Sequence, residues 1–163
     1  MILPGHVALA ALAAKGTGVD LPASLAASMA PDLVDKPLRW LLRATPNDRI
    51  PAHTLLFWAG STALVWALSG RERRSALARG WAVGYGAHLA GDHLNSYLNP
   101  GRIYPLWPFK RYRLHRGPTG LHSSLGDFSP ASLLLEGAAV AVALLAWAAG
   151  LFGDQRGADS RRS

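Results

Sequence analysis

Hydrophobic residues fall into a series of runs that polar, proline-rich segments separate, and these runs predict helices. The first two cover about residues 4–15 and 20–30, and each opens with a proline or a capping aspartate. We expect the second to end at Ala30, because Pro31 disfavours helical geometry in the residue before it. Both helices are short, so we expect a hairpin in which each crosses only part of a bilayer. No basic residue precedes the first run, so a cleaved signal peptide is not expected.

Three longer apolar segments predict membrane-embedded helices. Residues 53–69 have about the minimum length for a span, and residues 81–95 return from a short basic turn. Residues 131–153 form the longest apolar segment, broken only by Glu136 near its start. We expect Glu136 to reach toward the interface or to pair with an arginine, with an outer role in the site described below as the alternative.

Two basic segments are expected at the membrane surface. Residues 36–43 place Lys36, Arg39 and Arg43 on one helical face and leucines on another, which is typical of an interfacial helix and also of a solvated surface helix. Residues 99–118 lack a regular period, and we expect this loop to lie at headgroup level through its aromatic and basic side chains, namely Tyr104, Trp107, Phe109, Tyr112, Lys110, Arg111 and Arg113.

These segments together predict an all-α fold, a small multi-helix integral membrane bundle. Residues 1–153 are expected to form a single helical membrane domain, and residues 154–163 a disordered tail. Basic residues divide almost evenly between the two ends of such a bundle, so the positive-inside rule does not orient it.

The amino-acid composition limits the kinds of metal site that the chain can form. Half of the 163 residues are hydrophobic, 17% are charged, and cysteine is absent. Disulfides and thiolate metal sites are therefore excluded, and any metal must be held by His, Asp or Glu. The net charge of +7 raises the possibility of nucleic-acid binding. The basic residues accompany apolar and aromatic loops, however, so membrane lipid is the expected partner and no specific nucleic acid is expected.

Candidate chemistry centres on His88 and Asp92. Residues four apart lie above one another on a helix, so this imidazole and this carboxylate point the same way, with Tyr85 and Asn95 extending the polar stripe. One interpretation is a hydrogen-bonded pair inside the helical core. The other is a metal site, which requires further ligands to converge on the pair.

The order of helices predicts such convergence. If the chain runs up and down, His6, Asp32, Asp35 and His53 fall at the same end of the bundle as the His88 and Asp92 pair. Imidazoles and carboxylates together suit zinc, with manganese or iron as alternatives. The sequence therefore predicts a metal site between helix ends.

The ordered motifs resemble the bacterial membrane-bound metal-dependent hydrolases, the YdjM-like group. The matching motifs span about residues 1 to 115 and are Gly5-His6, Pro31-Asp32, Arg49 with His53-Thr54, His88 with Asp92, and Leu106-Trp107-Pro108. The resemblance implies a helical fold, a location in the bacterial inner membrane, and a metal held by His6, Asp32, His53, His88 and Asp92. This group is also distantly similar to zinc-dependent phospholipases C and single-strand nucleases, which favours phosphoester hydrolysis.

The chain departs from the family pattern at several positions. Asp48 stands where the family box begins with His, Ile50 replaces a Gly, and Asp35 lies three residues beyond Asp32 where a spacing of two is usual. A second similar string begins at His115-Arg116-Gly117 and ends at His122-Ser123; it is either part of the site or a basic loop that contacts phosphates. His93 lies on another helical face and is treated as a neighbour of the site.

The expected mechanism is metal-assisted hydrolysis of a phosphoester or lipid-like substrate in a multi-pass inner-membrane protein. Asp35 is the first choice for the general base, and Arg49 is expected to hold an anionic group of the substrate. Two other classes stay open: a non-catalytic membrane scaffold with a structural polar or metal site, and a transporter that uses His and Asp as an ion path.

Overall fold

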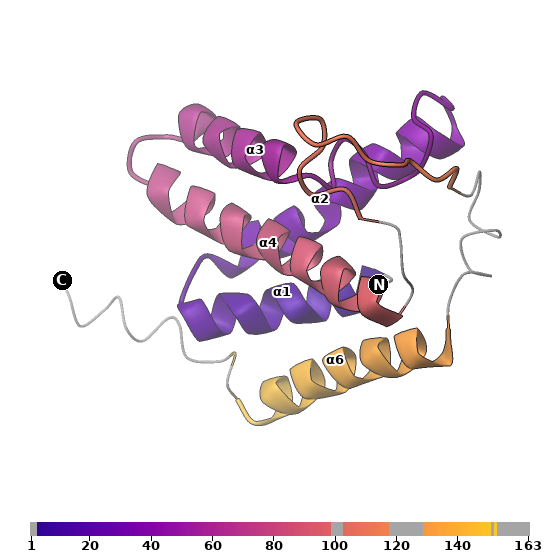
Figure 1. Cartoon of the computed structure of the whole chain (residues 1–163). Coiled ribbons are helices and arrows are strands. Elements are labelled where there is room, and N and C mark those ends of the chain that lie inside the picture. The colour runs from indigo at the N-terminus through magenta and orange to yellow at the C-terminus, as the bar shows by residue number, and fades with distance from the viewer. Residues whose placement is uncertain (1–2, 99–102, 118–128, 151, 153–163) are drawn as a thin grey trace.

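The computed structural model describes residues 3–98, 103–117, 129–150 and 152, and within them the fold is all-α, without strands. The expected helical class is therefore confirmed for these residues, whereas the predicted disordered tail and His122 lie outside them. Figure 1 shows the helices, which are α1 (Leu3–Thr17), α2 (Leu21–Trp40), α3 (Leu55–Leu68), α4 (Arg74–Leu98) and α6 (Pro130–Ala148).

Side-chain caps fix the starts of three helices. The Asp20 carboxylate accepts a hydrogen bond from the Ala23 N–H at 2.9 Å and caps α2, while Thr54 and Ser129 cap α3 and α6. The turn between α1 and α2 passes through Gly18, whose φ of 66° is readily adopted only by glycine. The predicted hairpin of the first two helices is present.

Helix α2 does not end at Ala30, so this prediction is wrong. It continues through Pro31 and Pro37 to Trp40, and residues 36–40 are its last turns rather than a separate interfacial helix. A proline inside a helix costs about 3 kcal/mol, because one hydrogen bond is lost and the ring crowds the preceding turn. Pro31 is buried in the bundle, and Asp35 accepts hydrogen bonds from the Ala52 and His53 N–H groups, so tertiary contacts favour the continued helix.

Helices α2 and α4 approach each other closely through glycines of α4. A Cβ on Gly84 would lie 1.9 Å from the Ser24 carbonyl oxygen, and one on Gly80 would lie 2.7 Å from the Asp20 carbonyl oxygen. Small residues four apart are the usual means of bringing two membrane helices into backbone contact. Contacts advance in the same direction along both helices, so α2 and α4 run parallel.

The two most apolar helices flank this pair on opposite sides. Helix α3 packs on α4, and α6 packs mainly on α1 (Figure 1). None of the residues of α3 is buried, and α6 exposes large side chains such as Leu134, Leu145 and Trp147. Exposed apolar surface of this extent on two helices is typical of contact with lipid.

The expectation of three embedded spans is met only in part. Among the described helices, α6 alone has the length and apolarity needed to cross a membrane. Helix α3 has 14 residues and reaches about 21 Å, short of the about 30 Å hydrocarbon core. Helix α4 is long enough, but its polar stripe lowers its hydropathy below that of a span.

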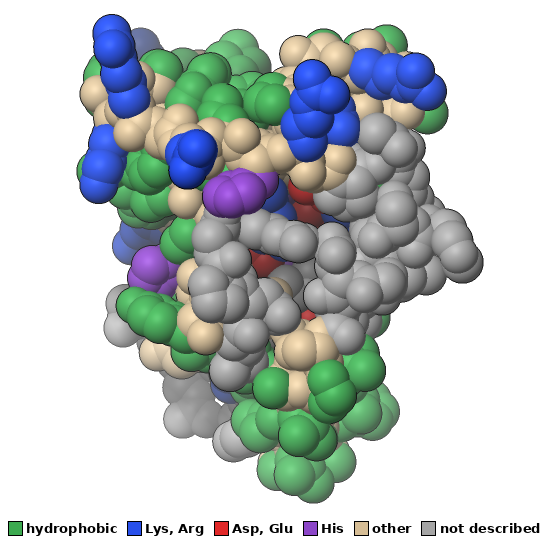
Figure 2. All heavy atoms as spheres, turned by 45° about the vertical axis from the view of Figure 1, so that its right-hand side comes forward, with side chains coloured by type: hydrophobic (Ala, Val, Ile, Leu, Met, Phe, Trp, Pro, Cys, Tyr) green, Lys and Arg blue, Asp and Glu red, His purple; other side chains and the backbone are tan. Residues whose placement is uncertain are grey.

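The described part of the basic aromatic loop, residues 103–117, rests on the segment before α3. The Leu55 N–H donates to the Pro105 carbonyl at 2.9 Å, and the Gly117 N–H donates to the Pro46 carbonyl at 3.0 Å. Tyr104 is buried, and its hydroxyl accepts the His115 N–H, whereas the expected place of this loop at headgroup level stays a prediction. Figure 2 shows basic side chains gathered among hydrophobic ones at one end of the face in view, mainly hydrophobic ones at the other end, and acidic ones recessed between the two ends.

The contact at Gly84 yields a prediction about stability. Replacing Gly84 by Ala places a methyl group against the Ser24 backbone, so we expect a loss of about 1–3 kcal/mol and a lower unfolding temperature in detergent. Gly86→Ala is the matched control on the same helix, because its Cβ would meet only Trp58 at 3.9 Å. Equal unfolding temperatures for the two variants would show that α2 and α4 are not in close contact at this point.

Candidate metal centre

Five side chains from four segments meet at one end of the bundle. His6 lies near the start of α1, Asp32 lies on α2, His53 directly precedes the cap of α3, and His88 and Asp92 lie on α4. All three imidazoles and Asp92 are buried, and Asp32 is nearly so. The structure therefore places together the five residues that the sequence nominated as ligands; that they bind a metal stays a prediction.

The nitrogen and oxygen atoms of this cluster face one another at short range. His53 Nε2 lies 3.1 Å from His88 Nε2, 3.4 Å from Asp92 Oδ2 and 3.5 Å from Asp32 Oδ1. His6 Nε2 lies 3.4 Å from Asp92 Oδ1, and its ring stacks on His88 with centroids 3.6 Å apart. Two triads have all their ligand atoms within 4.8 Å of one another, and they are His6, Asp32 and His88, and His53, His88 and Asp92.

The other ring nitrogens fix the tautomers of two imidazoles. His88 Nδ1 lies 2.6 Å from the Ser28 carbonyl oxygen, which can only accept, so Nδ1 carries the hydrogen. His53 Nδ1 lies 2.7 Å from Asp35 Oδ2, whose carboxylate already accepts two backbone N–H groups. In their neutral forms both rings therefore point an Nε2 lone pair into the cluster. Two lone pairs 3.1 Å apart, with carboxylates around them, require a cation or a proton.

The charges around His53 also favour positive charge at this place. Burial by itself opposes protonation of His53, but its hydrogen bonds with Asp32 and Asp35 and the nearby Asp92 charge raise its pKa to about 9. Without a metal, the imidazole of His53 would therefore hold a proton between carboxylates at neutral pH. A divalent cation at the same place would satisfy the same oxygens and also the lone pairs of the rings.

The segment that carries His53 is held from two helices. Asp35 on α2 accepts the Ala52 N–H at 2.9 Å and the His53 N–H at 3.1 Å, and the Tyr85 hydroxyl on α4 donates to the Ala52 carbonyl at 2.6 Å. Asp35 is wholly buried and both its oxygens have partners. Its expected role as general base stays untested, and these contacts favour a positioning role for it.

Two cations flank the carboxylates of the cluster. Arg49 forms an ion pair with Asp92, and its side chain is 23% exposed where that of Asp92 is 3% exposed, so the guanidinium lies on the outer side. Lys36 Nζ lies 2.6 Å from Asp32 Oδ2. Asp32 still directs Oδ1 at the imidazole of His53, and both oxygens of Asp92 lie within 3.6 Å of an imidazole nitrogen.

The other residues that the sequence singled out lie apart from these triads. His93 is exposed and contacts Tyr97, and the backbone N–H of His115 donates to Tyr104. Asp48 and the buried Glu136 belong to neither triad, within the residues that the structure describes. Sequence reasoning did not find the Ser28 carbonyl, because no local pattern marks a backbone oxygen as the partner of a histidine on another helix.

Residues 2–155 match the family model described as YdjM inner membrane protein. The chain belongs to this family. The match covers nearly the whole sequence and confirms the resemblance inferred from the ordered motifs. No curated protein and no solved structure matched the chain. As a YdjM inner membrane protein, the chain combines a membrane-length apolar helix with a buried cluster of His and Asp that could bind a metal ion.

The contacts of Asp35 predict a large effect on folding. Asp35→Ala leaves the Ala52 and His53 N–H groups without their acceptor, and each such loss costs about 1–3 kcal/mol. We expect a clearly lower unfolding temperature in detergent. Glu72→Ala, in the exposed turn before α4, is the control and should leave that temperature unchanged. An unaltered Asp35→Ala protein would mean that the His53 segment is held by other contacts.

Proposed function

We propose that this YdjM family member is a metal-dependent hydrolase of the inner membrane that acts on a phosphoester or lipid-like substrate. The observation that carries the proposal is the pair of Nε2 atoms of His53 and His88, 3.1 Å apart and faced by Asp32 and Asp92. A structural polar core would pair each acceptor with a donor. With both rings neutral, as a bound metal requires, their donors are turned outward and their acceptors converge.

The residues present fit a divalent cation, most simply zinc. Three imidazoles and two carboxylates form a nitrogen and oxygen donor set without sulfur, as in catalytic zinc sites. The partners of His53 and His88, a carboxylate and a backbone carbonyl, are the usual outer partners of metal-binding histidines. When bound, such a cation supplies Lewis acidity and a lowered pKa of water.

The chain's own residues then have separate roles. Arg49 lies on the outer side of Asp92 and has further N–H groups with which to bind an anionic group of the substrate. Asp35 positions His53 and fixes its tautomer. Asp32 is the most exposed of the three carboxylates, at 12% of its side chain, so it is better placed than Asp35 to exchange a proton with a substrate.

Multi-pass insertion is part of the proposal. Helix α6 meets the length of a span, and α3 exposes apolar side chains along its whole length. If both lie in the bilayer on opposite sides of the bundle, the cluster at the helix ends comes near the interface. This placement favours a substrate that is itself in the membrane.

Removal of single ligands tests the site. We expect single alanine variants to have a much lower affinity for zinc, and the positions are His6, Asp32, His53, His88 and Asp92. The loss should exceed about 10–100-fold, which is the usual effect of removing a hydrogen-bond partner of a metal ligand. Metal content of detergent-purified protein gives the result, and hydrolysis of model phosphomonoesters and phosphodiesters should fall with it. His93→Ala and Glu136→Gln are controls that should retain both. Metal-replete protein without hydrolysis of any ester would favour the scaffold alternative.

Single cysteines test insertion, because the natural chain has none. Leu64→Cys on α3 and Leu144→Cys on α6 have similar exposure, and both should resist a water-soluble maleimide in intact membranes and react in detergent. Glu72→Cys in the turn before α4 should react when its side of the membrane is open to the reagent. A Leu64→Cys protein that reacts as fast in membranes as in detergent would place α3 in water and leave α6 as the span.

A further inference from the structure

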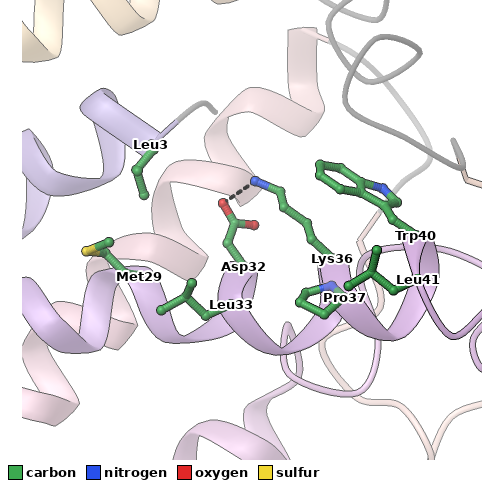
Figure 3. A pocket seen from close by; sticks show the side chains of 8 residues that line it. All are labelled: Leu3, Met29, Asp32, Leu33, Lys36, Pro37, Trp40 and Leu41. Carbon is green, nitrogen blue, oxygen red and sulfur yellow. Dashed lines mark hydrogen bonds and ion pairs between the residues drawn. The ribbon is translucent and has the colours of Figure 1, made fainter.

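An apolar groove opens beside the metal-binding cluster. It has a volume of about 330 Å³ and lies between the start of α1 and the C-terminal half of α2. Figure 3 shows its lining, in which Leu3, Met29, Leu33 and Leu41 surround the ion pair of Lys36 and Asp32. Small-molecule sites have volumes of about 300–1,000 Å³ and are mostly apolar with a few polar groups, so the groove has the size and character of a ligand site.

The polar groups of the groove connect it to the cluster. Asp32 lines the groove with Oδ2 at 2.6 Å from Lys36 Nζ, while its Oδ1 lies 3.5 Å from His53 Nε2. One carboxylate therefore forms the boundary between an apolar groove and the imidazoles. A molecule seated in the groove would reach the cluster at Asp32.

Charge and aromatic character identify the kind of occupant. Lys36 is the basic side chain among the described lining residues, it is 31% exposed, and its ammonium lies 5.9 Å from the ring centre of Trp40. An ammonium and a tryptophan at the rim of an apolar groove match the headgroup level of a lipid, with an anionic group at the lysine. Neither a soluble sugar nor a free phosphate would make apolar contacts with the leucine-lined part of the groove.

We propose that this groove holds an acyl chain of a lipid phosphate ester, with the phosphate at Lys36 and directed past Asp32 toward the cluster. The inference rests on the proposed hydrolase function and names its substrate class as a membrane phospholipid of anionic head group. Lys36 is the proposed specificity-determining residue, because it is the basic side chain among the described residues that line this rim.

Photocrosslinking in lipid nanodiscs tests the groove without relying on hydrolysis. Two lipids carry the same diazirine in the acyl chain, one with the phosphate head group of phosphatidic acid and one with phosphocholine. We expect phosphatidic acid to label the tryptic peptide of residues 16–39 several-fold more than phosphatidylcholine does. Labelling of the peptide of residues 117–156, which carries α6, should not depend on the head group.

Two variants and one control localise the effect. Lys36→Gln should abolish the head-group preference of peptide 16–39, and Leu33→Trp should lower its labelling by both lipids by filling the groove. Leu144→Trp is the matched control, since Leu33 and Leu144 are 65% and 60% exposed, and it should leave peptide 16–39 as in the parent. Equal labelling by both lipids in the parent, or a preference that survives Lys36→Gln, would overturn the inference.

The same samples separate this inference from the hydrolase proposal. Asp92→Ala should lose zinc and keep the head-group preference, because Asp92 does not line the groove. A parent that binds zinc and hydrolyses esters without any head-group preference contradicts the groove alone. A parent that shows the preference but binds no metal supports the groove and contradicts the proposed function.

Discussion

The backbone contact between α2 and α4 is the constraint on which the rest of the structure depends. Gly80, Gly84, His88 and Asp92 follow one another at intervals of four, so they occupy a single face of α4. The two glycines bring that face against α2, and the next position in the same row then places His88 within 2.6 Å of the Ser28 carbonyl. A wider separation of the helices would remove this hydrogen bond and leave the tautomer of His88 undefined. Helix packing and site chemistry therefore share one stripe of residues.

Pro31 illustrates where local sequence rules and the three-dimensional fold disagree. The rule that proline ends a helix predicted a loop at Asp32 and Asp35, whereas the helix continues and points these carboxylates toward different partners. Asp32 faces the imidazoles and Lys36, and Asp35, one turn later, faces the segment of His53. The proline expected to end the helix thus lies inside it, directly before the stretch that carries both carboxylates.

The sequence was most informative where spacing within one helix carried the signal. The His88 and Asp92 pair, the apolar α6 and the hairpin of α1 and α2 followed from periodicity and from prolines and caps. Counting the helices predicted the end of the bundle at which His6, Asp32 and His53 lie. Contacts across segments could not be read in this way, because nothing in the local pattern shows that Asp35 binds the backbone at Ala52 and His53 or that Arg49 pairs with Asp92. The depth of α3 in a membrane also cannot be predicted from the sequence, because its 14 residues are apolar on all sides of the helix.

Formation of the cluster is coupled to formation of the fold. His6, Asp32, His53 and His88 come from four segments, and the unfolded chain cannot hold them within a few ångströms of one another. A cation that binds the native cluster and not the unfolded chain stabilises the native state by mass action. Without it, a proton on His53 can bridge the two facing ring nitrogens, while Arg49 and Lys36 pair with the carboxylates. The same end of the bundle therefore favours bound positive charge, whether as a proton on His53 or as a cation among the imidazoles and carboxylates.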